Sequence, residues 1–401
     1  MAIHYNMSMR VLQFSKGSEL GGLAVFAKIE RDLLQKHITV EPFYVDTAIK
    51  LETAESRKGG LARIGEIKGY INRAKAKIDA FQPDILHIHS LLPFITPAII
   101  RYAHSRKIPM VFTLHDYKLL YYDGMIYRKD PPRRFWRDLF QPERWKHGSL
   151  PLTLLYGYLL NYYRGIGLYN KVDRFIAPSG KLYHHFIRQG FNEDAMEYIP
   201  HFMPDFSDMS ADSGTEQHHN EEIDNKIKFL YLGRLSPEKG VLELVHQWIA
   251  QEIPYQLDIV GSGVLKSPIA RSIKNNSLVH LLGDKPWKDG VSHLNSSTAL
   301  IVPSICYESF GLNILEAFVL GKPVICTEKA GRKELVVPGE TALTYKVDDA
   351  EDLKEQVLRL AGDVDLRNRL GRTGRKRYEE NFTRNNYLDA ILQVYENVVR
   401  M

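Results

Sequence analysis

Glu308 and Glu316 stand eight positions apart around Gly311. An apolar run at 299–302 precedes them and another at 323–326 follows, which is the order strand, loop, helix, strand of a parallel α/β unit. Ligands of such sheets collect in the loops after the carboxyl ends of the strands. We expect Glu308 in that loop and Glu316 on the next helix, whose first N–H groups face the loop. This mixture of donors and acceptors suits a polyhydroxylated, phosphorylated ligand.

Two cations follow the first apolar run of the same half of the chain, at 228–232. Arg234 can bind a phosphate through two N–H groups, and Lys239 acts as a point charge. Basic residues in loops are mostly solvated, so this pair gains meaning only from sharing a domain with the two glutamates. Together the four residues predict a site for a diphosphate and neighbouring hydroxyls.

The first half offers weaker candidates. Gly21 and Gly22 follow the first predicted strand, where the backbone can approach a phosphate closely, although a plain turn explains them equally well. His115 ends a buried strand and could hydrogen-bond a sugar hydroxyl or take up a proton. We expect only one of His87 and His89 to face the core, and His89 to be the one in a cleft. Each histidine has a purely structural role as its alternative.

No metal site is predicted. Cys306 and Cys326 are the only cysteines, and no histidine pair stands near them, so we interpret both as buried and reduced. The one Asp-x-Asp spacing, at 363–365, lies between helical stretches, where Asp is a good N-cap. We therefore expect no metal cofactor.

Composition is typical of a globular protein. The chain has 401 residues, of which 44% are hydrophobic and 25% are charged, enough for two or three domains. The start does not resemble a signal peptide, and the longest apolar tract, residues 150–160, is shorter than the roughly 20 residues a membrane span needs. We predict a cytoplasmic protein.

Alternating strand and helix patterns predict an α/β fold with two doubly wound, Rossmann-like domains. The N-terminal domain would comprise residues 1–205 together with a C-terminal helix at about 384–401 that crosses back onto it. A polar linker would follow at 206–225, and the second domain would comprise residues 226–383.

An insertion at 117–172 interrupts the first domain. It is rich in aromatic and basic residues, and an excess of Lys and Arg here accounts for the whole net charge of +5. Basic and aromatic residues together favour an interfacial element on an anionic membrane, which would place the protein peripherally on the inner face of the membrane. An insertion that covers its own hydrophobic cluster is the alternative. Nucleic acid is not an expected partner, since no recognised motif accompanies the charge.

Taken together, Gly21-Gly22, His115-Asp116, Arg234 with Lys239, and the E-x7-E element from Glu308 to Glu316 resemble the retaining glycosyltransferases of family 4. The resemblance covers nearly the whole chain and implies the GT-B fold, in which two Rossmann-like domains face a central cleft. It implies a nucleotide diphosphate-sugar as the donor substrate. The chain departs from the family pattern in having one glycine, Gly331, before the later glutamate, and His201 where an asparagine is common.

The resemblance also implies individual roles. Arg234 and Lys239 would neutralise the leaving diphosphate, Glu308 would lie beside the transferred sugar, and His115 would orient that sugar; these four form the implied catalytic set. Glu316 would hold the ribose hydroxyls. Further donor contacts would come from Gly21, Gly22, Lys285 near the base, and the N–H groups of Phe310, Gly311 and Leu312. His89 and Arg332 would be the acceptor-side residues.

We therefore predict a retaining, metal-independent glycosyltransferase acting on a cell-surface polysaccharide or lipid-linked glycan. A soluble phosphorylase or sugar synthase that uses a small sugar acceptor is the nearest alternative. A catalytically silent sugar- or nucleotide-binding protein is the alternative from another class. The donor base, the sugar, the acceptor, the linkage and the oligomeric state stay open.

Overall fold

The computed structural model describes residues 8–15, 22–44, 60–89, 95–121, 124–126, 150–206, 227–330 and 333–401. Within these ranges the chain divides into two compact units. The first contains strand β1 (Arg10–Ser15), Leu23–Pro200 and Tyr387–Met401, and the second contains His201–Asn386. The predicted linker at 206–225 lies outside the described residues apart from its first residue.

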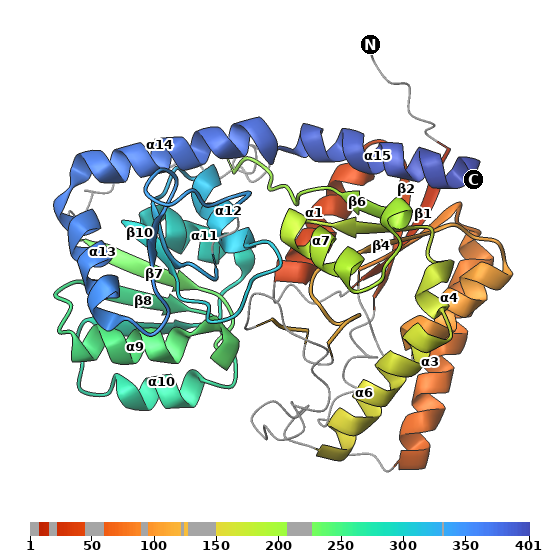
Figure 1. Ribbon diagram of the computed structural model, residues 1–401, viewed down its shortest axis with the longest axis horizontal. Helices are drawn as coiled ribbons and strands as arrows, with labels where there is room; N and C mark the ends of the chain where they lie inside the picture. Colours follow the sequence, from red (N-terminus) through yellow and green to blue (C-terminus); the bar gives the residue numbers. More distant parts are fainter. Residues whose placement is uncertain are drawn as a thin grey trace. The chain divides into compact units, whose positions relative to one another are not determined.

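The first unit is built on a parallel sheet with the spatial order β2-β1-β3-β4-β5-β6 (Figure 1). Besides β1, its strands are β2 Thr39–Tyr44, β3 Ile85–Ile88, β4 Met110–Thr113, β5 Arg174–Ala177 and β6 Met196–Tyr198. Its helices are α1 Gly22–Leu34, α3 Gly60–Phe81, α4 Ile95–Ser105, α6 Leu150–Gly165, α7 Gly180–Arg188 and α15 Arg384–Arg400, with 3-10 turns η3 Leu168–Lys171 and η4 Glu193–Ala195.

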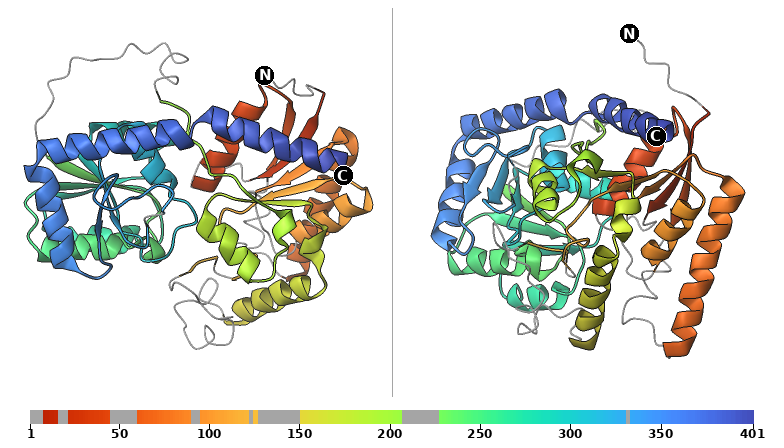
Figure 2. Two further views of the ribbon diagram at one scale, coloured as in Figure 1. Left: turned by 45° about the horizontal axis from the view of Figure 1, so that its top comes forward. Right: turned by 45° about the vertical axis from the view of Figure 1, so that its right-hand side comes forward.

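The second unit repeats the plan with the order β12-β11-β10-β7-β8-β9, again all parallel. Its strands are β7 Lys228–Leu232, β8 Gln256–Val260, β9 Val279–Gly283, β10 Ala299–Val302, β11 Val324–Thr327 and β12 Leu343–Tyr345. Its helices are η5 Pro237–Lys239, α9 Val241–Ala250, α10 Lys266–Ser272, α11 Trp287–Ser296, α12 Leu312–Val319, α13 Ala350–Gly362 and α14 Val364–Asn381. Helices cover both faces of this sheet (Figure 2).

The apolar runs of the sequence become the central strands. β3, β4 and β10 are buried along their whole length, as expected of parallel strands covered on both faces. Two α/β units with doubly wound sheets are therefore confirmed. β6 and β12 were not predicted. Each has three residues and lies at a sheet edge, which is too short a strand to show the alternation of apolar and polar side chains.

Both sheets have a switch point, where the strand order reverses direction. In the first unit it lies between β1 and β3, and in the second between β7 and β10. Loops leaving the carboxyl ends of these strands diverge to opposite faces, which leaves a crevice where open α/β sheets bind ligands. A ligand site is therefore expected at the loops that follow β1, β3, β7 and β10.

The C-terminal helix α15 packs on the first unit, as predicted. Tyr387 and Tyr395 are buried, and their hydroxyls contact Glu30 of α1 and His87 of β3. The aromatic residues of α15 therefore complete the core of a domain whose other elements lie before residue 201.

Two further expectations hold. Cys306 and Cys326 are free thiols in buried positions. Asp363 caps α14, because its Oδ1 accepts a hydrogen bond of 2.8 Å from the N–H of Leu366. Among the described residues, no helix combines the length and the apolar content needed to cross a membrane.

Candidate functional site

The candidate donor site of the second unit lies at its switch point. Gly233 and Arg234 leave the carboxyl end of β7, while Pro303 and Ser304 leave the carboxyl end of the neighbouring strand β10. The amide of Asn313, in the first turn of α12, donates to the carbonyl of Leu232 at 3.3 Å. The two loops and the start of α12 are therefore held together at one edge of the sheet.

Gly240 fixes the distance between the loops. It ends the 3-10 turn η5 with a φ of 66°, and a Cβ placed on it would lie 2.1 Å from the carbonyl oxygen of Pro303. A side chain at this position would push the two loops apart, so glycine is required both for the backbone conformation and for the close approach. The contact brings Lys239, the preceding residue, beside the loop that carries Glu308.

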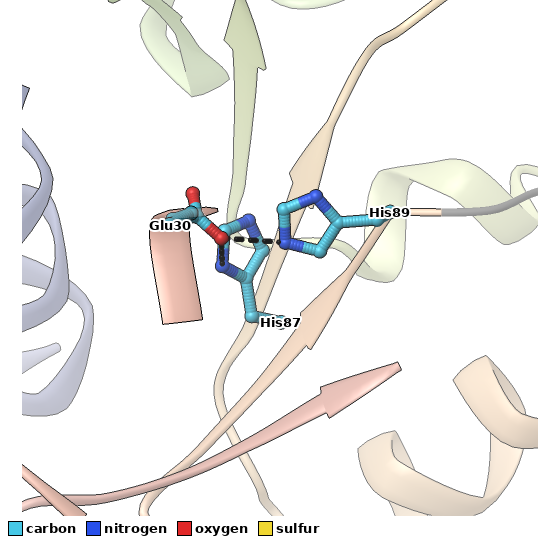
Figure 3. Close-up of side chains that lie close together, drawn as sticks. All are labelled: Glu30, His87 and His89. Atoms are coloured by element: carbon cyan, nitrogen blue, oxygen red, sulfur yellow. Dashed lines mark ion pairs between the residues drawn. The ribbon is translucent and has the colours of Figure 1, made fainter. Parts of the chain in front are cut away.

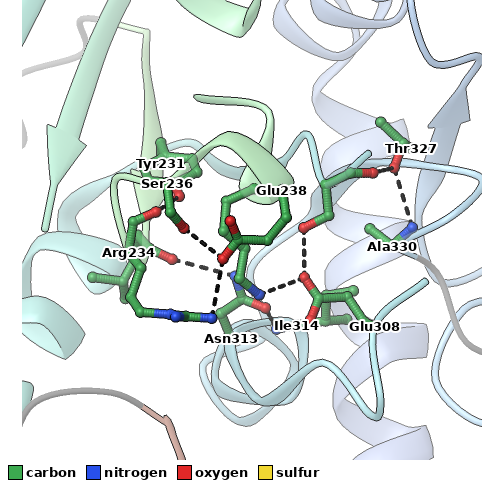
Figure 4. Close-up of polar contacts among 12 residues, drawn as sticks. Tyr231, Arg234, Ser236, Glu238, Glu308, Asn313, Ile314, Thr327 and Ala330 are labelled. Atoms are coloured by element: carbon green, nitrogen blue, oxygen red, sulfur yellow. Dashed lines mark hydrogen bonds and ion pairs between the residues drawn. The ribbon is translucent and has the colours of Figure 1, made fainter. Parts of the chain in front are cut away.

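Lys239 and Glu308 form an ion pair. The Lys239 Nζ lies 2.6 Å from Glu308 Oε1, and the two side chains are 23% and 13% exposed. The hydroxyl of Ser304 donates to the same carboxylate oxygen, and the hydroxyl of Thr327 donates to the Ser304 carbonyl at 2.6 Å (Figure 4). Glu308 is therefore held in one orientation by two donors, and Thr327 in turn fixes the backbone of one of them, Ser304.

Arg234 has a carboxylate partner of its own. Its Nη2 lies 3.1 Å from Glu238 Oε1, which also accepts from the Ser236 hydroxyl at 2.6 Å (Figure 4). The buried Tyr231 hydroxyl donates to the Arg234 carbonyl at 2.6 Å, which fixes the backbone of the loop. The Arg234 side chain is 61% exposed, so its guanidinium remains accessible to an anion.

Helix α12 begins at a glycine, and within its first turn the Oδ1 of Asn313 accepts from the N–H of Ile314 at 3.0 Å. Its N-cap is Gly311, at a φ of 107°, and no side chain bonds to the first turn from that position. The first N–H groups and the positive end of the helix dipole therefore favour an anion at this end. Phe310 is buried and packs edge-on against His201 and Phe382, so only its backbone can serve a ligand.

Glu316 is buried on α12 and accepts a hydrogen bond from Trp287. The indole Nε1 of Trp287, at the start of α11, lies 2.7 Å from Glu316 Oε1. Burial raises the pKa of Glu316 to about 7, although the indole hydrogen bond opposes the rise. Glu308 therefore pairs with Lys239 and Glu316 with Trp287, and the two carboxyl groups lie in different environments.

The remaining predicted donor residues are less informative. Lys285 is exposed in the loop between β9 and α11, and Gly22 is exposed as the first residue of α1. Gly21 and Arg332 lie outside the described residues.

In the first unit, His115 follows β4 and is partly buried. Its Nε2 lies 3.0 Å from Nδ1 of His89, and the Nε2 of His89 lies 2.9 Å from Glu30 Oε2 on α1 (Figure 3). The prediction that only one of His87 and His89 faces the core is wrong. Residues two apart in a strand point to the same face, and both rings are buried with centroids 4.1 Å apart.

The prediction that His89 contacts an acceptor also does not fit this arrangement. Its side chain has no exposed surface, and its two ring nitrogens face Glu30 and His115. His89 therefore lies behind His115 rather than in contact with a ligand.

The cluster of Glu30, His87 and His89 has donor atoms close enough together for a metal ion. Each donor atom is already hydrogen-bonded, however. His87 contacts the hydroxyls of Tyr395 and Thr113, both at 2.7 Å, and Glu30 accepts from His89. The arrangement is that of a hydrogen-bonded network, in which no ligand atom is left for an ion.

Helix α6 is the described helix of the predicted insertion. Four of its residues and the residue directly after it line one exposed apolar strip: Leu154, Leu155, Tyr158, Tyr162 and Ile166 are 40%, 40%, 63%, 45% and 47% exposed. Most of the insertion's other aromatic residues lie outside the described residues. Large apolar side chains exposed at helical spacing indicate a surface that meets something other than water.

Sequence reasoning missed two residues of these networks. Glu30 occupies a core position in the stripe of α1, alongside Phe26, Ala27, Leu33 and Leu34, and a carboxylate in such a stripe was a detectable signal. Trp287 gave no comparable signal, because its partner lies 29 positions away in sequence.

Comparison with known families covers both units. The model of Glycosyltransferase Family 4 matches residues 52–204, and that of Glycosyl transferases group 1 matches residues 213–377. An uncharacterised glycosyltransferase of Methanocaldococcus jannaschii is 32% identical over 171 residues, 42% of this chain and 48% of that protein. The capsular polysaccharide biosynthesis glycosyltransferase CapM of Staphylococcus aureus is 27% identical over 192 residues, 46% of this chain and 50% of that protein.

These matches span about half the length of the relatives. Among solved structures, Anabaena HepE in complex with UDP-glucose superposes with a TM-score of 0.66 at 17% identity, covering 97% of this chain and 100% of that one. At this identity the likeness establishes the fold, which is GT-B. The two family models, which between them cover most of both units, place the chain in the GT-B superfamily of group 1 and family 4 glycosyltransferases.

Proposed function

We propose that the protein is a retaining, metal-independent glycosyltransferase that moves a sugar from a nucleotide diphosphate-sugar to a cell-surface polysaccharide or lipid-linked glycan. The observation that carries the proposal is the Lys239–Glu308 pair beside the start of α12, in the unit that matches the group 1 model. The activity named for the relatives supports the reaction class, and the capsular role named for CapM supports the acceptor class.

The chemistry follows from the charges. Departure of a nucleoside diphosphate concentrates negative charge on the phosphate oxygens, and preorganised donors stabilise this charge in the transition state. Lys239, Arg234 and the first N–H groups of α12 supply such donors. In the resting protein each cation is paired with a carboxylate, so the diphosphate would share Lys239 with Glu308 and Arg234 with Glu238.

Glu308 would then act on the sugar. Its Oε1 accepts from Lys239 and Ser304, which orients the carboxylate toward the place of the transferred sugar. In a retaining reaction of this kind the acceptor attacks from the face of the leaving group, and the departing phosphate removes its proton. No protein nucleophile is needed, which agrees with a glutamate fixed by a cation.

Glu316 would bind the ribose. One oxygen accepts from Trp287, and the other is available to a ribose hydroxyl. A carboxyl group with a pKa of about 7 can hydrogen-bond to a ribose hydroxyl in both of its protonation states, because the protonated carboxyl donates and the ionised carboxylate accepts.

A lipid-linked acceptor is favoured over a small soluble sugar by the exposed strip of α6. Aromatic side chains at helical spacing suit the boundary between lipid headgroups and acyl chains. A soluble phosphorylase or synthase has no evident use for such a strip.

The reaction is tested with purified protein and a panel of nucleotide diphosphate-sugars, with and without EDTA. We expect a donor to raise the unfolding temperature, since a ligand that binds only the folded state stabilises it. Product NMR should show the anomeric configuration of the donor, and EDTA should leave the rate unchanged. Inverted product or an EDTA-sensitive rate would contradict the corresponding part of the proposal.

Lys239→Met provides the site test, with Lys266→Met as the matched control. Lys266 is an exposed lysine at the start of α10 in the same unit. We expect the first variant to lose donor binding and the second to retain it. Unchanged transfer by Lys239→Met would remove Lys239 from the site.

A further inference from the structure

A chain of hydrogen-bonded groups lies behind His115 in the first unit. The Tyr387 hydroxyl of α15 donates to Glu30 Oε1, Glu30 Oε2 lies 2.9 Å from His89 Nε2, and His89 Nδ1 lies 3.0 Å from His115 Nε2. Glu30 and His89 have no exposed side-chain surface. The chain therefore joins the C-terminal helix to the histidine at the end of β4 without passing through solvent.

The proton on His89 can be assigned from its partners. Burial alone would raise the pKa of Glu30, but His89, His87 and the Tyr387 hydrogen bond outweigh it and lower the pKa to about 2. Glu30 is thus a carboxylate, which can only accept. At 2.9 Å the Nε2 of His89 must donate to it, and the Gln13 amide donates to the same oxygen at 2.8 Å.

The proton on His115 then follows. A neutral His89 that donates through Nε2 has a bare Nδ1, so the bond to His115 takes its proton from His115 Nε2. Neutral His115 therefore carries its proton on Nε2 and presents Nδ1 as an acceptor. Without Glu30, this bond could form equally well with His89 Nδ1 as the donor or with His115 Nε2 as the donor.

We propose that Glu30 and His89 are positioning residues for His115: the carboxylate fixes the proton of His89, and His89 fixes which nitrogen of His115 carries a proton. This inference rests on the proposed transferase function and on the role that the family resemblance implies for His115, which is to orient the transferred sugar. It means that the direction of the hydrogen bond offered to the sugar is set by a glutamate that never meets the substrate.

The same chain can store one additional proton. If His115 accepts a proton at Nδ1, its Nε2 proton can pass to Nδ1 of His89 along the 3.0 Å bond. His115 is then neutral with its proton on Nδ1, and the positive charge is on His89, in contact with the Glu30 carboxylate. Every proton is conserved, and the charge moves into the protein.

The surroundings favour this behaviour. The other titratable groups that face His89 are His87, Tyr387 and Tyr395. Burial lowers the pKa of His87 to about 3, so His87 is neutral. Burial also raises both tyrosine pKa values, so both tyrosines keep their protons. Phe26 packs against the rings of His115 and Tyr387 and separates the chain from water.

Nitrogen-15 NMR of the histidines in the full-length protein tests the assignment directly and needs no substrate. In the wild type we expect His89 protonated on Nε2 and His115 on Nε2 at high pH. In Glu30→Gln the amide can either donate or accept, so we expect a mixture of tautomers at both rings.

Tyr395→Phe is the matched control. It removes a buried hydroxyl from the same helix, but that hydroxyl contacts His87 and lies outside the chain to His115. We expect the wild-type tautomer of His115 in this variant. A tautomer change as large as that of Glu30→Gln would reduce the role of Glu30 to general packing and overturn the proposal.

Two more results decide the matter. If Glu30→Gln does not fold, Glu30→Asp is the second variant: it keeps the charge but draws the carboxylate away from His89, so it should give a mixture of tautomers at His115 as well. A wild-type His89 with its proton on Nδ1, or a stoichiometric metal ion in the purified protein, would overturn the assignment. With an active donor, Glu30→Gln should lower kcat more than it raises KM, while Tyr395→Phe should keep both close to the wild type. Failure of every donor would contradict the proposed function and leave the NMR result standing.

Discussion

Lys239 and Glu308 meet in an ion pair of 2.6 Å although 69 positions separate them in sequence. The contact exists because a glycine lets η5 pack against the loop after β10. The cation that would receive the leaving diphosphate and the carboxylate that would hold the sugar are therefore positioned by each other.

Replacing Glu308 by glutamine should impair turnover more than donor binding. The amide keeps the shape but loses the charge that orients Lys239 and accepts from the sugar. We expect kcat to fall about 100-fold or more, as for removal of a group that acts mainly in the transition state. Calorimetric titration with the donor, beside steady-state rates, separates the two effects. Wild-type kcat in this variant would contradict the role given to Glu308.

Gly240→Ala should destabilise the second unit. The new Cβ would meet the Pro303 carbonyl at 2.1 Å and hold a strained positive φ, so we expect a loss of about 3 kcal/mol or more. Gly339→Ala is the matched control, because its φ of 78° is similar and no atom lies within 4 Å of the added Cβ. Its cost should be limited to backbone strain, about 1–2 kcal/mol. Thermal unfolding of both variants measures the difference, and equal losses would show that the contact with Pro303 does not matter.

The stability of the second unit should fall as pH rises through the range in which Glu316 titrates. Burial raises the pKa of Glu316 from 4.5 to about 7, so the folded state holds a proton that the unfolded state releases between these values. The stabilising contribution of the protonated form is complete below pH 4.5 and is lost by about pH 7. The loss amounts to about 3 kcal/mol.

Glu316→Gln provides the comparison for this titration, because the amide has no proton to release. We expect the difference in unfolding temperature, wild type minus this variant, to decrease as the pH rises from 5 to 8. Trp287→Phe should extend the decrease to higher pH, since the indole hydrogen bond holds the pKa down. A constant difference between wild type and Glu316→Gln would mean that Glu316 is ionised throughout.

The α6 strip should bind anionic vesicles. Tyr158 and Tyr162 are its largest exposed side chains, so the double change to serine should reduce flotation with phosphatidylglycerol-containing liposomes by about tenfold. Val264→Ser, at a residue 78% exposed in the second unit, controls for loss of any exposed apolar group. Absence of flotation in the wild type would favour the soluble-acceptor alternative.

The fold was largely predictable because its central strands are buried on both faces. Runs such as 299–302 have no polar residue and are bounded by turn residues, so both their type and their order could be inferred. The edge strand at 343–345 was missed, since its conformation depends on pairing with β11 more than on its own residues.

The members of the candidate site could be proposed from the sequence, but their contacts could not. Residue type and spacing identified Lys239 and Glu308 separately, but their pairing depends on the tertiary approach of two loops. The histidines were misjudged for a simpler reason, since strand alternation places His87 and His89 on the same face. Glu30 was not predicted, although a carboxylate within the apolar stripe of α1 is a detectable signal.

The position of Tyr387 has a consequence for biosynthesis. The hydroxyl that completes the environment of Glu30 lies beyond the entire second unit in sequence, so it leaves the ribosome after that unit. Until then the nascent first domain has a buried carboxylate with one donor missing and an apolar surface that α15 has not yet covered. The N-terminal domain therefore cannot reach its final state before the second domain has been translated, and its histidine network forms only after that.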